Sequence, residues 1–342
     1  MMLKKILLFC LIAVVALIVA YRELIGYGLR QGIGQLSIVW NARPISEVLA
    51  DDQFPDSLKQ KLRLVQAVRQ FAIDSLGLKD TKNYRTLYDQ KGEEILWVVT
   101  ACEPFRLIEK QWEFPVLGAV PYKGFFNKEL AMKEKEKLEE AGWDVNIRNP
   151  GGWSTLGWFT DPILSKMLER REGDLASLII HEMVHATIFV KDSVDFNENL
   201  ASFIGDRGAE QFLIYHFGHT SKEYQQFLLE DREFRAYANH MLRGCDYLDS
   251  VYRAIADYPL NEKIEAKHSA IAHIINTSDS LAFTTFSRPS ALYSSKLPNN
   301  AYFMSFKRYQ SRQDIFWTDW KNKFRGDLKQ YIQHLSSTYP FL

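Results

Sequence analysis

Residues 174–205 of the chain read DLASLIIHEMVHATIFVKDSVDFNENLASFIG. Apolar residues recur at helical spacing from Asp174 to Val190, which predicts a helix packed into the core. The polar segment 191–196 predicts a short loop, and a second helix is expected to begin at Asn197. This stretch therefore predicts two helices joined by a tight turn.

The first of these helices carries the pattern His-Glu-x-x-His, from His181 to His185. Side chains four residues apart lie on the same face of a helix, so both imidazoles can bind one metal ion. Burying two histidines and Glu182 in an apolar helix would destabilise the protein unless these polar side chains bind a common ligand. The pattern predicts one zinc ion bound by His181 and His185, with Glu182 as the general base for a metal-activated water.

A third metal ligand is expected to come from the second helix. A third histidine close by is excluded, because Ile188 and Lys191 stand where a Gly-x-x-His continuation would have its glycine and histidine. We expect the ligand to be Glu198, since the first turn of the second helix faces back toward the first helix. Asp195 is the main alternative, and Asp192 would also serve if the chain turned sharply.

The His-Glu-x-x-His pattern followed by Glu198 resembles the thermolysin-like zinc metallopeptidases, or gluzincins, whose third ligand is a glutamate on a following helix. Two features depart from that pattern. Only twelve residues separate His185 from Glu198, and Ser202 stands where those enzymes have an aspartate that orients the first histidine. Support for His181 is then expected from Asp206 or from a backbone carbonyl.

Several further segments are shared with one bacterial family. They are residues 32–36 (GIGQL), 114–118 (FPVLG), 121–126 (PYKGFF), 154–159 (STLGWF) with 161–162 (DP), the metal motif with 196–198 (FNE), and 299–301 (NNA). Through these segments, most of the chain after its amino end is similar to a bacterial family described as zinc-dependent aminopeptidases. The resemblance implies a metallopeptidase fold, a zinc ion, and the removal of amino-terminal residues from peptides.

The amino end contains an uninterrupted apolar run over residues 6–20, preceded by two lysines. This run predicts a membrane anchor or signal segment over residues 1–22, and the lack of a small-x-small cleavage site favours an uncleaved transmembrane helix. The lysines favour a cytoplasmic amino terminus, so we expect a membrane-anchored protein whose catalytic domain is periplasmic or extracytoplasmic. In such a compartment Cys102 and Cys245 are available for a disulfide.

The rest of the chain, residues 23–342, predicts one domain that is mixed α/β to about residue 173 and mainly helical after it. We therefore expect an α+β, zincin-like metallopeptidase fold with a small mixed sheet in the amino half, a helical carboxyl half and an N-terminal transmembrane helix. The helices expected besides the metal-motif pair are Ser57–Leu76, Lys128–Ala141, Ser221–Tyr258 and Gln313–Leu335, and the main strands are Ile95–Thr100 and Asp144–Ile147.

Candidate substrate-binding residues lie in three places. Tyr122 is a candidate donor to the oxyanion of a tetrahedral intermediate. The segment 153–159, with Trp153, Ser154 and Thr155, either forms an edge strand that pairs with the substrate backbone or seals the core. Near the carboxyl end, the residues that either line the substrate cleft or cap the last helices are Asn299, Asn300, Tyr302 and Tyr309.

The predicted function is zinc-dependent peptide hydrolysis, with an aminopeptidase favoured and peptide as substrate. An aminopeptidase also needs a group that binds the free ammonium of its substrate, and the unranked candidates are Glu103, Glu113, Asp161 and Asp206. The alternatives are an endopeptidase with the same mechanism and a non-catalytic, membrane-tethered binding protein that contains a metal. The balance of 42 basic against 42 acidic residues argues against a nucleic-acid partner.

Overall fold

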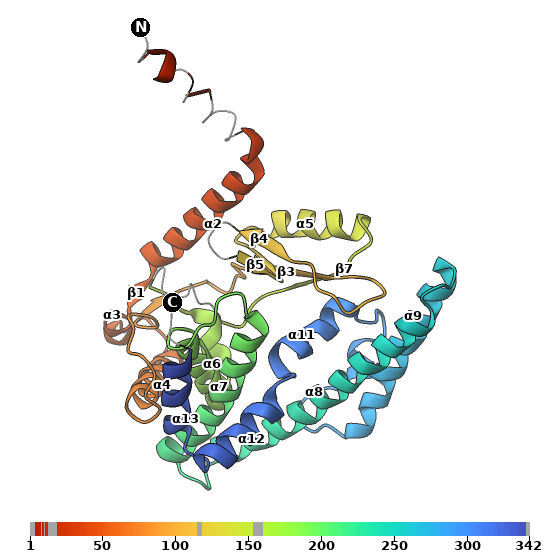
Figure 1. Ribbon diagram of the computed structural model, residues 1–342. Coiled ribbons are helices and arrows are strands. Elements are labelled where there is room, and N and C mark those ends of the chain that lie inside the picture. Colours follow the sequence, from red (N-terminus) through yellow and green to blue (C-terminus); the bar gives the residue numbers. More distant parts are fainter. Residues whose placement is uncertain are drawn as a thin grey trace.

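The structure is a computed structural model that describes residues 4–7, 9, 11–12, 19–114, 118–152 and 160–339 (Figure 1). Its centre is a pair of helices, α6 (Glu172–His185) and α7 (Val194–Phe217), which make the most extensive contact between any two elements. Helix α4 (Asp56–Asp74) packs against α6, while α12 (Gln313–Phe324) and α13 (Leu328–Thr338) pack against α7. The His-Glu-x-x-His helix is thus enclosed by the main hydrophobic core.

A second group of helices packs beside this core. The long helix α8 (Lys222–Ala254) contacts α7, α9 (Leu260–Thr277) and α11 (Asn300–Gln310), and their apolar faces enclose a separate hydrophobic cluster. The short elements η2 (Ser278–Leu281) and α10 (Pro289–Leu292) connect α9 to α11. In Figure 1 this group, coloured from cyan to blue, lies on the right of the central pair.

The strands form three small sheets. The largest has the antiparallel order β6–β3–β7, and Figure 1 shows it between α5 (Lys128–Glu140) and α11. The other two have the orders β1–β2–β8 and β4–β5. The strands are β1 (Arg43–Pro44), β2 (Thr86–Tyr88), β3 (Trp97–Cys102), β4 (Trp112–Phe114), β5 (Gly118–Val120), β6 (Lys123–Phe125), β7 (Asp144–Arg148) and β8 (Ile163–Leu164).

The remaining elements are helices α2 (Arg22–Asn41) and α3 (Ile45–Ala50) and the 3₁₀ helix η1 (Ser165–Glu169). The expectation of an α+β, zincin-like fold is therefore corrected: the described chain is mostly helical and carries only small, separate sheets. The physical reason is that several segments with strand composition pair over only two or three residues.

The predicted N-terminal transmembrane helix is also corrected. Within the described residues, no helix is long and apolar enough to cross a membrane. Helix α2, which follows the apolar run, carries arginines and a glutamate among its apolar residues. The expectation of a membrane-anchored protein depended on that helix and is corrected with it as far as the described residues go; residues 1–3, 8, 10 and 13–18 of the predicted anchor lie outside them. Cys102 and Cys245 are both buried and free, so they form no disulfide.

Two expected helices differ from those observed. The segment 313–335 forms α12 and α13 rather than one helix, because Arg325 and Gly326 adopt left-handed backbone conformations between them. The metal-motif helix ends at His185 rather than Val190, and the turn that follows contains Asp192 at a φ of 56°. The second helix of the pair consequently begins at Val194, earlier than the expected Asn197.

Candidate metal centre

The loop between α6 and α7 is held closed by Asn197. The backbone N–H of Val190 donates to Oδ1 of Asn197 (2.9 Å), and Nδ2 of Asn197 donates to the carbonyl oxygen of Val190 (2.7 Å). Asn197 is buried, so these bonds are shielded from water. The clamp fixes how α7 starts relative to the end of α6, and Glu198 follows directly after it at the beginning of the second turn.

Close packing of the two helices depends on Gly205. A Cβ at this position would lie 2.9 Å from the carbonyl oxygen of Ser177 and 3.2 Å from Cβ of His181. Any side chain would therefore push α7 away from α6. Glycine at this position allows Glu198 to approach the two histidines.

The three predicted ligands lie together. Nε2 of His181 and Nε2 of His185 are 3.1 Å apart, and Oε2 of Glu198 lies 3.4 Å and 3.6 Å from them, respectively. In a tetrahedral zinc site with metal–ligand distances of about 2.0–2.1 Å, two ligand atoms are about 3.3–3.4 Å apart. The three side chains therefore fit a zinc ion in both chemistry and spacing. Among the described residues, no other His, Cys, Asp or Glu joins this group, and neither Asp192 nor Asp195 belongs to it.

Glu182 is buried beside the ligands in the same cavity. Its carboxylate lies against the backbone of Gly152, where a Cβ would overlap Oε1 of Glu182 and lie 2.7 Å from Leu178. Burial raises the pKa of Glu182, and the nearby His181 and His185 only partly offset that effect. A carboxylate held in this way is a strong proton acceptor.

The charges of the cluster depend on one another. Burial alone would raise the pKa of Glu198, but His185 and His181 beside it hold that pKa well below its usual range. Burial likewise opposes protonation of His185, yet the Glu198 carboxylate outweighs it and raises the pKa of His185. The two opposite shifts favour a Glu198–His185 ion pair when no metal is bound, and a metal ion would compete with the proton for these side chains. Nδ1 of His185 is buried and finds no hydrogen-bond partner within the described part of the chain, so packing orients that ring.

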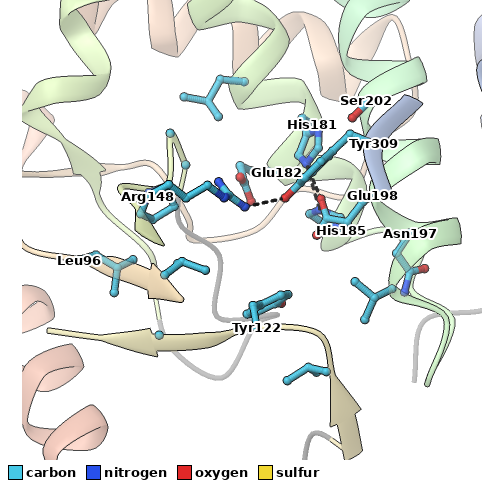
Figure 2. A pocket seen from close by; sticks show the side chains of 18 of the residues that line it. Leu96, Tyr122, Arg148, His181, Glu182, His185, Asn197, Glu198, Ser202 and Tyr309 are labelled. Carbon is cyan, nitrogen blue, oxygen red and sulfur yellow. Dashed lines mark hydrogen bonds and ion pairs between the residues drawn. The ribbon is translucent and has the colours of Figure 1, made fainter. Parts of the chain in front are cut away.

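A cavity of about 1330 Å³ opens over these residues. Its walls come from α2, the β4–β6 region, the end of β7, α6, α7, α8 and the end of α11. Figure 2 shows Tyr309 beside His181 and Glu198, with Arg148 on its other side and Tyr122 across the cavity. Such a volume is large enough for several residues of a peptide.

Tyr309 and Arg148 form a pair at the edge of the ligand cluster. Nη2 of Arg148 donates to the hydroxyl of Tyr309 (3.2 Å), and the rings of Tyr309 and His181 are 6.5 Å apart. Burial and the Glu198 carboxylate raise the pKa of Tyr309, so its phenol stays protonated. Because an arginine can only donate, the phenol proton of Tyr309 is left for another acceptor.

The end of α11 is joined to α7 next to the predicted glutamate ligand. Nδ2 of Asn199 donates to the carbonyl oxygen of Arg308 (2.5 Å), and the backbone N–H of Arg312 donates to Oδ1 of Asn199 (2.8 Å). Nε2 of Gln313 also donates to the carbonyl oxygen of Asn199 (3.0 Å). Asn199 is completely buried. This set of bonds, which we call the Asn199 junction, fixes Tyr309 relative to Glu198.

The other candidate substrate-binding residues fall into different places. Tyr122 lines the cavity. Asn300 does not line it: the side chain is fully buried, accepts from the Tyr252 hydroxyl (2.6 Å) and donates to the carbonyl oxygen of Glu103 (2.8 Å). Its role is to hold the β3–β4 connection against α8 and α11. Trp153, Ser154 and Thr155 lie outside the described residues.

Of the acids considered for binding the substrate ammonium, Asp206 alone lines the cavity. Oδ1 of Asp206 accepts from Ser177 (2.7 Å), and no ion pair to Asp206 is found among the described residues. Burial, reinforced by the nearby Asp231, raises the pKa of Asp206 to about 6. Asp161 is buried beside Asn83, and Glu113 is exposed on β4.

Sequence reasoning missed Arg148, Gly152 and the clamp by Asn197. Arg148 ends a strand in the amino half and meets Tyr309 only because the β6–β3–β7 sheet packs against α11. No local signal predicts such a contact between residues far apart in the chain. Gly152, in contrast, is the second glycine of a Pro-Gly-Gly turn. A glycine at such a position indicates that another group lies close to the backbone, so the sequence did contain a signal for it.

Fold and site together define a mainly helical protein with a His-His-Glu cluster beside a buried glutamate. The chain matches the family described as "Putative aminopeptidase" over residues 26–339, and it belongs to that family. Comparison with the curated proteins and with the solved structures finds no match.

Proposed function

We propose that this protein is a zinc-dependent peptidase, and specifically an aminopeptidase. The observation that carries the proposal is the triangle of Nε2 of His181, Nε2 of His185 and Oε2 of Glu198, whose sides of 3.1–3.6 Å suit one zinc ion. Family membership supports peptide hydrolysis, and the size of the cavity supports a peptide as substrate. Histidine and carboxylate ligands favour zinc over harder cations.

The residues around the cluster have distinct roles in this proposal. Bound zinc would supply a polarised water and a Lewis acid for the scissile carbonyl group. Glu182 accepts the proton of the attacking water and later passes it to the departing amine. Its burial favours this exchange, because a carboxylate shielded from bulk water takes up a proton more readily.

Tyr309 stabilises the oxyanion that forms when water attacks the carbonyl carbon. The hydrogen bond from Arg148 polarises the phenol and leaves its proton free to donate toward the developing negative charge. Tyr122, on the opposite wall, contacts the substrate. Donors that are already oriented cost little reorganisation during the reaction.

Asp206 binds the free ammonium of the substrate. It is a largely buried carboxylate in the cavity with no ion pair among the described residues, so a cationic ligand would compensate its charge. This role limits cleavage to chain ends. An endopeptidase of the same mechanism is the second candidate, because the cavity extends away from the cluster both toward α2 and toward α8.

The test combines metal analysis with kinetics on Glu182→Gln. We expect about one zinc ion per chain in both proteins, and a loss of turnover of about 10²-fold to 10⁴-fold in the variant. Glu113→Gln, at an exposed position outside the cavity, is the matched control and should keep full activity. Unchanged peptide cleavage by Glu182→Gln would reject the catalytic assignment.

A digest of peptides with free and with acetylated amino ends separates the two candidates. An aminopeptidase leaves the acetylated set intact. Equal cleavage of both sets would retain the metal chemistry and replace the aminopeptidase proposal with the endopeptidase. Asp206→Asn should raise the KM of free-ended peptides only in the first case.

A further inference from the structure

One end of the cavity is lined by aromatic side chains. Helix α8 contributes Phe227 and Phe234, which are seven residues apart and lie on the same face of the helix. The segment between η2 and α10 contributes Phe286. Phe227 is buried, whereas Phe234 and Phe286 are 44% and 36% exposed, and we call these two residues the aromatic pair. The chemistry described above does not use them.

The segment that carries Phe286 is fixed to α8 by Glu233. Oε1 of Glu233 accepts from the backbone N–H (2.9 Å) and from the hydroxyl (2.5 Å) of Thr284. Oε2 accepts in the same way from the N–H (2.9 Å) and the hydroxyl (2.6 Å) of Thr285. The ring of Phe286 also packs against Tyr237 of α8, with the ring centroids 6.1 Å apart. These contacts hold Phe286 in place without covering its ring, so an apolar surface is formed before a ligand binds.

The aromatic pair lies near Asp206, the proposed site for the substrate ammonium. Nη2 of Arg207, the residue after Asp206 on α7, donates to Oδ2 of Asp231 on α8 (2.8 Å). Asp231 is also close enough to Asp206 to add to the effect of burial on the pKa of Asp206. Phe234 follows Asp231 by three residues, which is about 4.5 Å along the helix axis. A residue whose ammonium is bound at Asp206 therefore has Phe234 within reach of its side chain.

The acids of α8 at this end of the cavity already have cationic partners. Glu230 forms an ion pair with Arg171, and Asp231 pairs with Arg235 on its own helix (2.6 Å) in addition to its bond from α7. Their charges are thus compensated, and the surface left for a ligand side chain is that of the aromatic pair. A ligand with an ammonium for Asp206 and a large apolar side chain matches this end in charge and polarity.

A competing feature is Asp174, which lines the cavity one turn before Ser177 on α6. A free carboxylate there would favour a basic side chain in the ligand. Burial raises the pKa of Asp174, and the nearby Arg170 and Arg171 partly offset that effect. These two arginines already supply positive charge beside Asp174, so the geometry favours the apolar ligand over the basic one.

We propose that the aromatic pair binds the side chain of the first residue of the substrate and selects peptides that begin with a large apolar residue, above all an aromatic one. The proposal rests on the peptidase function above and deepens it by naming the substrate class. It also sets the direction of the bound peptide: the amino end lies at α8, and the chain continues past the ligand cluster toward α2.

The test compares peptides that differ only in their first residue, which is phenylalanine, alanine, arginine or glutamate. We expect kcat/KM to be at least tenfold higher for the phenylalanine peptide than for the alanine peptide, and higher than for both charged ones. Removing both rings, with Phe234→Ala and Phe286→Ala together, should bring the phenylalanine-to-alanine ratio close to one. Because the ratio compares two substrates on one protein, a smaller fraction of folded enzyme does not change it.

Two further variants sharpen the comparison. Tyr247→Ala removes an aromatic side chain from the same helix at the same exposure of 44%, but outside the cavity, and should leave the ratio unchanged. Glu233→Ala leaves both rings present and releases the segment of Phe286 from α8. Glu233 is a positioning residue in this proposal, so its loss should lower the ratio about threefold while kcat/KM for the alanine peptide stays the same.

Binding without turnover separates this proposal from the peptidase function. In the Glu182→Gln variant, phenylalanine amide should bind about tenfold more tightly than alanine amide, and the difference should disappear when both rings are removed. Such binding, in a parent protein that cleaves no peptide, would reject the peptidase and retain the aromatic pair as a binding site.

The opposite results overturn the aromatic pair and leave the peptidase standing. Peptide cleavage with equal rates for phenylalanine and alanine would do so, as would a preference for phenylalanine that persists without the two rings. A preference for arginine that is lost in Asp174→Asn would assign this end of the cavity to basic residues instead.

Discussion

Replacing Gly205 with alanine is expected to weaken both the fold and the metal centre. The new Cβ would lie 2.9 Å from the carbonyl oxygen of Ser177 and 3.2 Å from Cβ of His181. The nearest atom belongs to the backbone of α6, so the two helices must separate. Overpacking costs about 1–3 kcal/mol, and the higher helix propensity of alanine returns about 0.5–1 kcal/mol. We therefore expect a net loss of about 1–2 kcal/mol in the free energy of unfolding.

Two measurements check this result. Urea unfolding of the metal-free protein gives the change in stability, and competition with a chromophoric chelator gives the zinc affinity. Because α7 carries Glu198, a shift of that helix should weaken zinc binding by about 10-fold to 100-fold.

The matched control is Gly32→Ala, where the new Cβ meets open space. The same substitution should there raise the free energy of unfolding by about 0.5–1 kcal/mol. If both variants are more stable than the parent protein, helix propensity alone governs the outcome and the close-packing explanation is refuted.

Three more predictions concern single side chains. Tyr309→Phe should lower kcat about 10²-fold to 10³-fold with zinc content unchanged, and an unaltered kcat would remove Tyr309 from the mechanism. Burial raises the pKa of Asp206 from 3.8 to about 6, so the folded protein holds an extra proton between these values and loses stability as the pH rises through them. The Asp206→Asn variant does not lose stability in this way. The difference between its free energy of unfolding and that of the parent, measured with urea, should therefore rise by about 3 kcal/mol from pH 4 to pH 7. A difference that does not change with pH would contradict the raised pKa of Asp206. Asn197→Ala leaves the N–H and the carbonyl oxygen of Val190 without their partner, so the free energy of unfolding should fall by about 2 kcal/mol in the same assay. An unchanged free energy of unfolding would mean that the loop closes without the clamp.

The sequence was most informative where chemistry and local geometry coincide. Helical spacing alone places His181 and His185 on one face, and Glu198 is the first acid of the helix that was expected to begin at Asn197. Both inferences concern residues close in the chain. Helix α7 begins at Val194 rather than at the expected Asn197, because the clamp by Asn197 lets the helix start within the polar loop.

Long-range contacts were beyond such reasoning. Arg148 and Tyr309 are 161 positions apart and meet through the packing of a sheet on a helix. Asn300 was expected either to line the substrate cleft or to cap one of the last helices, and its side chain instead holds together buried parts of the fold. The apolar composition of residues 6–20 predicted a spanning helix, but the described part of the chain contains none.

The Asn199 junction has a consequence for how substrates are accommodated. It connects the acid proposed to hold the cation with the tyrosine proposed to face the reacting carbonyl, through hydrogen bonds shielded from water. Glu198 and Tyr309 are therefore expected to behave as one rigid unit. Any adjustment to substrates of different size then falls to the opposite side of the cavity, and selectivity among peptides can change there without altering the spacing of the reacting groups.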